Sequence, residues 1–377
     1  MKYRTMPRSP DRLSVLGFGL MRLPTLSDGA LDREESLKLM QYALEGGINY
    51  FDTAVPYMRG ESEALLGKFL SRVGRDKVFI ATKLPCWLIK TPEDLEAQLE
   101  QHLEKLKTSY IDYYLLHSLG RQSWSNLLKL KVLDFLDKAK ADGRIRFVGF
   151  SFHDHYPVFR KIVERYDWDF CQIMLNYLDT HYQAGLRGYR LAVDKGMGVI
   201  AMEPLRGGKL VHPIPAPILK LWEKSAVRLP PVERALRWVW NLPGCTVALS
   251  GMSNLEQLKE DITLASAASE NILDARELDL YKKVRREYIK RIAIPCTECR
   301  YCLPCPHSVA IPFVLGSYNE AIMFDDKPRH KQEYQNFIPD ANKADKCTNC
   351  GACLPKCPQK INIPAELEKV KDYFAED

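Results

Sequence analysis

Long hydrophobic runs are missing from this chain of 377 residues. No stretch approaches the roughly 20 consecutive apolar residues of a membrane-spanning helix, so we expect no membrane insertion. The first dozen residues carry Lys2, Arg4 and Arg8 with no apolar segment behind them. This pattern predicts that a secretory signal is absent and that the protein is cytoplasmic.

A strong charge imbalance is also missing. The formal net charge is +6, and the basic residues are spread along the chain without a nucleic-acid-binding motif, so we expect no nucleic-acid partner. One basic run lies in a helix expected over about 275–290. It indicates either a solvated helix face or a docking surface for an acidic electron carrier, and its members are Lys282, Lys283, Arg285, Arg286, Lys290 and Arg291.

The glycine fingerprint of a dinucleotide-binding Rossmann fold is absent where it could have occurred. Gly17 and Gly19 form only a G-x-G, without the third glycine or the downstream acidic residue. We therefore exclude a Rossmann fold at this position.

Cysteine is scarce over most of the chain. Of 11 cysteines, only Cys86, Cys171 and Cys245 fall in the first 290 residues, and the other eight lie between Cys296 and Cys357. Because disulfides are disfavoured in the cytosol, such a cluster of cysteines indicates metal binding.

The eight clustered cysteines form two runs with a spacing typical of iron–sulfur proteins. Each run has three cysteines at two-residue spacing and a fourth cysteine before a proline, which indicates [4Fe–4S] clusters. Structural zinc, which usually takes separated C-x₂-C pairs, is the alternative. The runs are Cys296, Cys299, Cys302 and Cys305 before Pro306, and Cys347, Cys350, Cys353 and Cys357 before Pro358.

We expect the two runs to exchange their fourth ligands between two clusters. Three closely spaced thiolates can bind one cluster while the fourth binds the other. One cluster would then take Cys296, Cys299, Cys302 and Cys357, and the other Cys347, Cys350, Cys353 and Cys305. The second run has the bacterial ferredoxin spacing, whereas the first has two residues rather than three before its last cysteine.

The rest of the chain alternates short apolar segments with expected helices, eight times over, at intervals of about 30 residues. The segments are apolar throughout, as in strands covered on both faces. We therefore predict an α/β fold with a (β/α)₈ TIM barrel over residues 1–290, followed by a small, mainly helical ferredoxin-type domain over 291–377. Strands are expected at 16–19, 48–51, 78–82, 111–116, 147–150, 170–175, 198–202 and 246–249, and one of the helices at about 126–141.

Polar side chains follow the ends of successive strands, at the barrel face where active sites of this fold lie. Asp52, Lys83 and His117 end three of them, and Tyr57 follows Asp52 by one turn. Reducing a carbonyl needs a proton for the developing alkoxide, which a tyrosine can supply. A neighbouring ammonium lowers the tyrosine pKa toward the working range, an aspartate holds that lysine, and a neutral histidine orients the carbonyl oxygen.

At these positions the sequence resembles the aldo-keto reductase family across almost all of residues 10–290, through Asn49–Ala54 with Tyr57, Ala81–Lys83 and Asp112–His117. With the cysteine runs, it resembles the subgroup that carries a C-terminal ferredoxin-type domain. The resemblance implies a nicotinamide cofactor, NADP(H) or NAD(H). Its contacts would be Ser151 and Gln172 at the nicotinamide, Pro204, Leu205 and Gly207 at the pyrophosphate, and Ser250, Gly251, Met252, Asn254 and Gln257 at the phosphate and adenosine.

The chain departs from the family pattern at three positions in or beside the implied cofactor site. Phe152 stands where many members have asparagine, Met202 replaces a common aromatic, and Gln257 stands where NADP-preferring members often carry arginine. Beyond the strand ends, four further side chains are candidates for the substrate pocket: Met58, Trp87, His153 and His155. Cys86 in the same region is expected to be inert.

Three functions follow as hypotheses. The first is an oxidoreductase that interconverts a small carbonyl and an alcohol, with clusters that pass electrons to or from a cofactor or a ferredoxin-like carrier. The second is an NADPH-dependent reductase with purely structural clusters. The third is an electron-transfer protein whose barrel is no longer catalytic.

Overall fold

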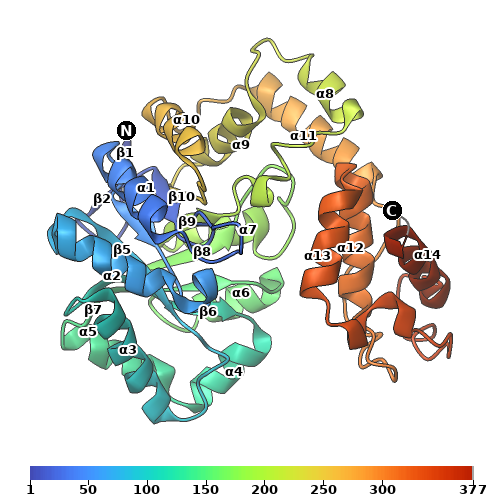
Figure 1. Cartoon of the computed structure of the whole chain (residues 1–377), viewed down its shortest axis with the longest axis horizontal. Helices are drawn as coiled ribbons and strands as arrows, with labels where there is room; N and C mark the ends of the chain where they lie inside the picture. Colours follow the sequence, from blue (N-terminus) through green and yellow to red (C-terminus); the bar gives the residue numbers. More distant parts are fainter. Residues whose placement is uncertain (376–377) are drawn as a thin grey trace. The chain divides into compact units, whose positions relative to one another are not determined.

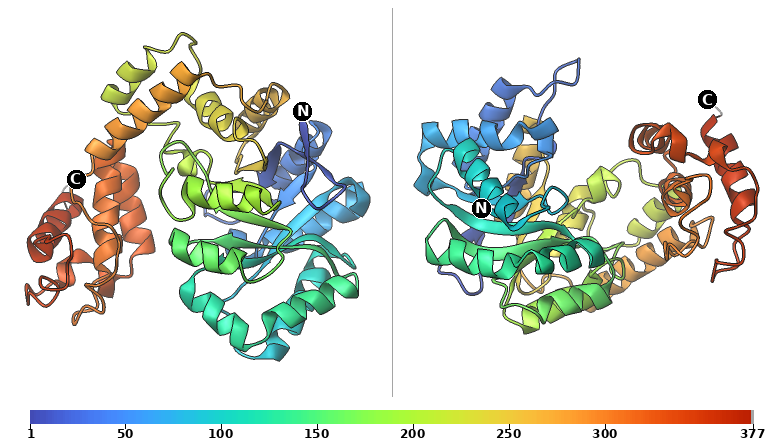
Figure 2. Two further views of the ribbon diagram at one scale, coloured as in Figure 1. Left: turned by 180° about the vertical axis from the view of Figure 1, so that it is seen from behind. Right: turned by 90° about the horizontal axis from the view of Figure 1, so that it is seen from below.

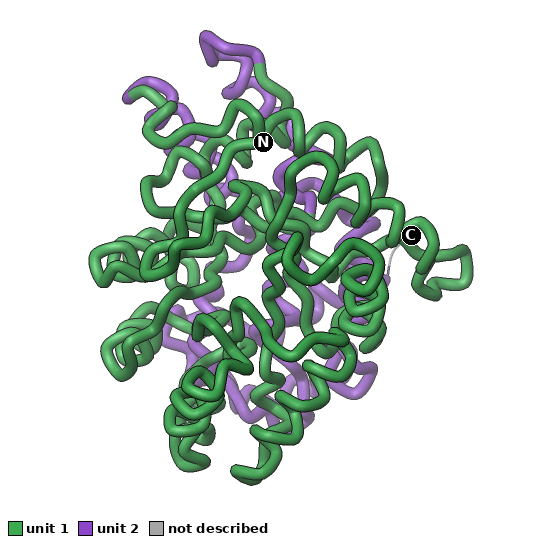
Figure 3. The backbone as a smooth tube through the Cα atoms, turned by 90° about the vertical axis from the view of Figure 1, so that its left-hand side faces the viewer, with its two compact units in different colours: residues 1–207, 229–274 green, residues 208–228, 275–377 purple. Residues whose placement is uncertain are grey.

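The computed structural model of the protein describes residues 1–375 and divides the chain into two compact units. Unit 1 comprises residues 1–207 and 229–274, and unit 2 comprises residues 208–228 and the described residues from 275 onward (Figure 3). The last two residues of the expected 291–377 domain lie outside the described residues. The boundary at residue 290 stays a prediction.

Eight parallel strands of unit 1 close into a barrel, as the sequence predicts (Figure 1). The ring runs in chain order and closes where the last strand pairs with the first. The strands are β3 (Leu16–Gly19), β4 (Tyr50–Asp52), β5 (Phe79–Leu84), β6 (Ile111–Leu119), β7 (Ile145–Phe152), β8 (Phe170–Met174), β9 (Gly198–Met202) and β10 (Cys245–Ser250).

Helices surround the ring of strands (Figure 2). Their N-termini are defined by local signals: the Asp32 side chain accepts from the Glu35 N–H at the start of the first helix, and Thr91 precedes Pro92 at the start of the third. The helices of unit 1 are α1 (Arg33–Glu45), α2 (Ser62–Val73), α3 (Pro92–Leu106), α4 (Arg121–Lys129), α5 (Val132–Ala141), α6 (Tyr156–Val163), α7 (Gly185–Asp194), α9 (Pro231–Trp240) and α10 (Leu255–Ser266).

One expected helix is wrong in its extent. The segment expected as a single helix over 126–141 is two helices, α4 and α5, which meet at Lys131. Lys131 has a φ of +55°, a left-handed conformation that turns the chain between them.

A feature that the sequence analysis did not predict closes the barrel at the N-terminal ends of its strands. Strands β1 (Tyr3–Thr5) and β2 (Arg12–Ser14) pair antiparallel, and Met6 and Leu13 join the buried cluster inside the barrel. Met6 lies so close to Gly198 at the start of β9 that a Cβ there would meet its sulfur at 2.0 Å. The barrel is therefore a packed core that is open to chemistry only at the other end.

Unit 2 has its own core. Ile311, Val314, Leu367 and Phe374 are buried in it, and cysteines of both runs pack against it. Its helices are α8 (Ala216–Trp222), α11 (Ala275–Lys290), α12 (Ile311–Phe324), α13 (Lys327–Phe337) and α14 (Ile363–Ala375). Short 3₁₀ turns complete the chain at Tyr57–Gly60, Arg75–Lys77, Arg206–Gly208, Asp340–Asn342 and Ala344–Lys346. None of the described helices is long and apolar enough to cross a membrane.

Candidate active site and cysteine cavities

Three of the four residues predicted for the catalytic site are joined by hydrogen bonds around one buried ammonium. Lys83 Nζ lies 2.6 Å from Asp52 Oδ1 and 3.2 Å from the Tyr57 hydroxyl oxygen, and it donates to the Thr53 carbonyl at 2.8 Å. Lys83 is fully buried and Asp52 nearly so. All donors of the ammonium therefore have acceptors within the protein.

His117 completes the group by ring contacts. Its imidazole lies edge-to-face with Tyr57, with ring centroids 6.2 Å apart, and 5.0 Å from the indole of Trp87. The imidazole is buried, and its Nδ1 has no hydrogen-bond partner among residues 1–375. The structure thus brings together all four predicted residues, and Trp87 with them.

The register of the barrel explains why these side chains meet. Ala81 pairs with Tyr113 and Lys83 with Leu115, and Ala81, Tyr113 and Leu115 all belong to the buried cluster inside the barrel. Side chains two residues apart on a strand share a face. Lys83 and His117 therefore lie on the inward face, one step beyond that cluster.

In this site the Lys83 ammonium and the Asp52 carboxylate stabilise each other's charge against the cost of burial. Burial raises the pKa of Asp52, which the Lys83 ammonium opposes. Burial also lowers the pKa of Lys83, but the charges of Asp52 and Tyr57 outweigh it and leave that pKa raised. We therefore treat Lys83 as charged and Asp52 as its counter-ion at neutral pH.

Tyr57 corrects one expectation. Burial raises the pKa of Tyr57 more than the Lys83 ammonium lowers it, so the phenol has a pKa above its ordinary value. The sequence led us to expect the opposite net direction, because burial is not visible in a motif. His117 agrees with its expectation: burial, followed by the Lys83 charge, lowers its pKa to about 2, which keeps the imidazole neutral.

Two residues expected at the nicotinamide lie on neighbouring strands, as Ser151 in β7 pairs with Gln172 in β8. The Gln172 side chain is buried and its Oε1 accepts no hydrogen bond from any described residue, while its Nε2 lies 4.0 Å from the Met202 sulfur. The Ser151 hydroxyl oxygen accepts from the Ser118 N–H at 2.7 Å. An orphaned buried carbonyl oxygen is costly, and an amide N–H of a bound ligand would satisfy it.

The loop after β9 contains Pro204, Leu205 and Gly207, and Gly207 has a φ of +63°. Arg206 in the same loop forms an ion pair with the buried Asp179 at 2.8 Å.

The segment after β10 contains the other expected contacts. Asn254 caps α10 by accepting from the Gln257 N–H. The Gln257 Oε1 accepts from the Ser253 N–H at 2.9 Å, and Met252 is buried. Ser250 ends β10 and faces Asp261 of α10, whose pKa burial raises to about 7 against the hydrogen bond from Ser250.

Arg22 is a residue of this region that the sequence analysis missed. Its side chain packs against Gly251, where an added Cβ would meet the arginine stem at 3.3 Å, and its Nη2 lies 3.2 Å from the Cβ position of Gly207. It also forms an ion pair with Glu203 at 3.7 Å. No motif marks Arg22, because only closure of the barrel brings the ends of β3, β9 and β10 together.

The remaining pocket candidates are divided. Trp87 contacts His117 although it is itself exposed, Met58 is half-buried, and His153 and His155 are exposed. Phe152, which stands where many family members have asparagine, packs its ring on Phe159 of α6. Burial raises the pKa of the Cys86 thiol to about 12, which agrees with an inert residue.

The eight clustered cysteines line two separate cavities in unit 2. Cys296, Cys299, Cys302 and Cys357 line one, and Cys305, Cys347, Cys350 and Cys353 line the other. Apolar residues of α12 and α14 complete both linings, with Ile311 shared. These are the two groups of four that the crossed assignment predicts. Among the described residues, no three His, Cys, Asp or Glu side chains form a group that could hold a single metal ion.

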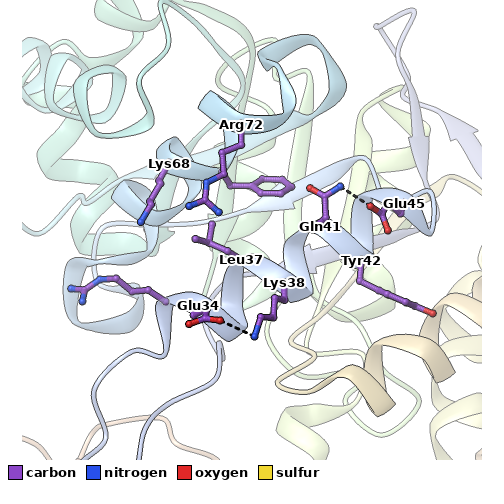
Figure 4. A pocket seen from close by; sticks show the side chains of 10 residues that line it. Glu34, Leu37, Lys38, Gln41, Tyr42, Glu45, Lys68 and Arg72 are labelled. Carbon is purple, nitrogen blue, oxygen red and sulfur yellow. Dashed lines mark hydrogen bonds and ion pairs between the residues drawn. The ribbon is translucent and has the colours of Figure 1, made fainter.

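A further groove lies on the outside of the barrel, between α1 and α2 (Figure 4). Leu37 and Phe69 form its apolar part, and charged side chains border it, among them Lys68 and Arg72 from α2. None of the predicted site residues lines this groove, so it is separate from the site at the strand ends.

Both parts of the chain are similar to known proteins. The family model described as "Aldo/keto reductase family" matches residues 15–278, and the model described as "4Fe-4S dicluster domain" matches residues 295–362. L-galactose dehydrogenase of Arabidopsis thaliana is 26% identical over 322 residues, which cover 78% of this chain and 97% of the relative. The NADH-specific methylglyoxal reductase of Escherichia coli is 24% identical over 66% of this chain and 87% of its own length.

Solved structures give the same picture for the barrel. The holo form of an aldo-keto reductase from Bacillus halodurans superposes with a TM-score of 0.64 at 26% identity and covers 75% of this chain and 96% of its own. An aldo-keto reductase from Klebsiella pneumoniae in complex with NADPH has a TM-score of 0.61 at 18% identity, over 76% of this chain and 95% of its own, and shows the shared fold.

Proposed function

The chain belongs to the aldo/keto reductase family, as an oxidoreductase with a C-terminal 4Fe–4S domain, and from this premise we propose that it interconverts a small carbonyl compound and the corresponding alcohol at Tyr57. The observation that carries the proposal is the buried Lys83 ammonium, which joins Asp52 and the Tyr57 hydroxyl in one site.

The four side chains would divide the work as follows. Tyr57, protonated at neutral pH because burial raises its pKa, holds the proton at its hydroxyl and donates it to the alkoxide. Lys83 stabilises the phenolate that remains, and Asp52 holds Lys83 in place. The neutral imidazole of His117 donates a hydrogen bond to the carbonyl oxygen and orients it toward Tyr57.

A nicotinamide cofactor, NADP(H) or NAD(H), fits the residues beside this site and would supply the hydride for the carbonyl carbon. The unpaired Oε1 of Gln172 supports this, because a carboxamide N–H is the donor it lacks. Ser151 would hold the same group. The loops after β9 and β10, with Gly207 beside the Arg22 guanidinium and Gly251 against its stem, would hold the phosphates.

We further propose that the two cysteine cavities hold two [4Fe–4S] clusters. Four thiols and an apolar lining suit such a cluster, which supplies one-electron transfer where hydride chemistry moves two electrons. Held by these cysteines, such clusters would split or gather electrons between the barrel and a ferredoxin-like carrier.

A second candidate function is a nicotinamide-dependent reductase whose clusters are purely structural. One observation favours it: the cysteines of both runs pack against the single core of unit 2, so filled cavities would also stabilise that unit. The two candidates differ in whether the nicotinamide reduces the clusters. Adding NADPH or NADH to anaerobically purified protein bleaches the visible absorbance of the clusters only in the first case.

The test of the catalytic proposal is Tyr57→Phe in anaerobically purified protein, assayed with NADPH and NADH against a panel of small aldehydes and ketones. We expect turnover to fall by about 10²–10⁴-fold, because the proton donor is lost. Tyr42→Phe, on α1 away from the site, is the matched control. Unchanged turnover in Tyr57→Phe would instead favour the third hypothesis, a barrel without carbonyl chemistry.

A further inference from the structure

The loop over residues 350–360 of unit 2, hereafter the cluster loop, runs from one cysteine cavity to the other. Cys350 and Cys353 line one cavity, and Cys357 and Gln359 line the other. Of the eight clustered cysteines, Cys350 is exposed and the other seven are buried or half-buried. The cavity of Cys350 is therefore the one with an exposed cysteine residue in its lining.

An apolar side chain lies at the surface of the same loop. Leu354 is 42% exposed, and its Cδ1 lies 3.7 Å from the Cβ position of Gly351, which lines the cavity of Cys350. An exposed leucine alone means little. Here it lies against Gly351, the chain neighbour of the exposed Cys350, with Pro355 and Pro358 restricting the backbone that carries it.

The positive charge of the cluster loop is not neutralised. Lys356 and Lys360 are exposed, and within residues 1–375 neither ammonium makes a hydrogen bond or an ion pair. Nearby lysines differ: Lys346 pairs with Asp345 and Lys343 with Asp340, both at 2.6 Å.

The basic run of α11 is the rival surface, and it is better neutralised. Lys283 pairs with Asp279 at 2.8 Å and Lys290 with Glu287 at 3.2 Å. The Arg291 guanidinium donates hydrogen bonds to the carbonyls of Ile322 and Met323. Both lysines of the cluster loop thus lack a counter-ion within residues 1–375, whereas Lys283 and Lys290 of α11 are paired, and this difference favours the cluster loop over α11 as a docking surface.

We propose that the cluster loop is the docking site of an acidic one-electron carrier protein of the ferredoxin class. Leu354 makes the dry centre of the interface, and Lys356 and Lys360 steer acidic side chains of the carrier onto it. The inference rests on the proposed electron-passing role of the clusters. If a cluster fills the cavity lined by Cys350, one electron would pass to it from the reduced iron–sulfur centre of the carrier, with no transfer of an atom or a proton.

The experiment compares binding of a purified acidic two-cluster bacterial ferredoxin to the iron-loaded full chain and to two double variants. Lys356→Glu with Lys360→Glu reverses the charge of the cluster loop, and Lys282→Glu with Lys283→Glu makes the same change on α11. Biolayer interferometry under anaerobic conditions, with both proteins oxidised, gives the association rate at low and high salt. We expect the first double variant to associate about 10-fold or more slowly at low salt and to lose most of its salt dependence, while the second stays near the unchanged chain.

Several outcomes would overturn the docking site: no binding of the ferredoxin at low salt, equal slowing in both double variants, or self-association of the chain that the Lys356 and Lys360 reversals abolish. The electron-passing role is tested separately, by bleaching of the cluster absorbance with reduced methyl viologen. If the clusters bleach but the Lys356 and Lys360 reversals leave ferredoxin binding unchanged, only the docking site is wrong. Clusters that do not bleach would overturn the electron-passing role.

Discussion

Asp52, Lys83, Tyr57 and His117 show how a buried site sets the protonation of its own members. The ammonium of Lys83 keeps a counter-ion because Asp52 lies 2.6 Å away. The same burial works against charge on the two aromatic groups, so Tyr57 stays a phenol and His117 stays neutral. A proton donor and a neutral hydrogen-bond donor are the forms that carbonyl reduction requires.

The pH dependence of stability follows from His117. Its pKa is about 2 in the folded protein and near 6.5 in the unfolded chain, so below about pH 6.5 the unfolded chain binds a proton that the folded protein does not. The contribution of His117 to stability is therefore complete above that pH and is lost progressively as the pH falls toward 2.

We expect His117→Gln to flatten the decrease in the free energy of unfolding between pH 7 and pH 4, measured by urea titration at each pH. His155→Gln, which changes an exposed histidine, is the control and should leave the decrease as it is. A decrease of the same steepness in His117→Gln and the unchanged chain would contradict the assignment of a neutral, buried imidazole.

At the scale of elements, the β1–β2 hairpin decides which end of the barrel is closed. Met6 and Leu13 fill the barrel at the N-terminal ends of its strands, against a glycine at the start of β9. The polar strand ends at the opposite face are thereby left as the place for a site.

Gly198→Ala tests this packing. The added Cβ would lie 2.0 Å from the Met6 sulfur, so that one of them must move, and we expect a loss of about 1–3 kcal/mol in the free energy of unfolding. The measurement is urea unfolding followed by far-UV circular dichroism. Combining the change with Met6→Ala should cost less than the sum of the two single changes, and strict additivity would show that the two residues do not share a space.

At the scale of the whole molecule, the division of eight cysteines between two cavities determines how the iron content of the protein should respond to cysteine mutations. Each proposed cluster takes its fourth thiol from the run that is distant in sequence. Neither run of cysteines could therefore complete a proposed cluster without a thiol from the other run.

We expect double cysteine variants to reveal this exchange. Cys296→Ser with Cys357→Ser disturbs one proposed cluster and should lose about as much iron as either single change, at most four atoms of about eight. Cys350→Ser with Cys357→Ser disturbs both and should lose more than either. Iron and sulfide analysis of anaerobically purified protein is the measurement, with Cys245→Ser in the barrel as the control. Loss from both clusters in the first pair and from only one in the second would favour uncrossed ligation, and zinc in place of iron would refute the cluster assignment.

Local patterns were sufficient for much of this protein. Apolar segments at regular intervals predict eight strands, because a strand buried on both faces needs apolar residues throughout. Asp52, Lys83 and His117 could be predicted as one group because the carboxyl ends of parallel strands meet at one face of a barrel. The spacing of the cysteines likewise indicates [4Fe–4S] ligation, since short loops can supply three thiolates to one cluster.

Other properties depend on side chains that are distant in sequence, and only the tertiary structure decides them. Burial sets the pKa of Tyr57 above its ordinary value, although the neighbouring Lys83 alone would lower it. Closure of the barrel places Arg22 beside Gly207 and Gly251, and the packing of unit 2 leaves Cys350 at the surface with Lys356 and Lys360 unpaired. The sequence determines which chemical groups are present and in what order. Their desolvation and their partners come from packing between distant segments, which no local pattern encodes.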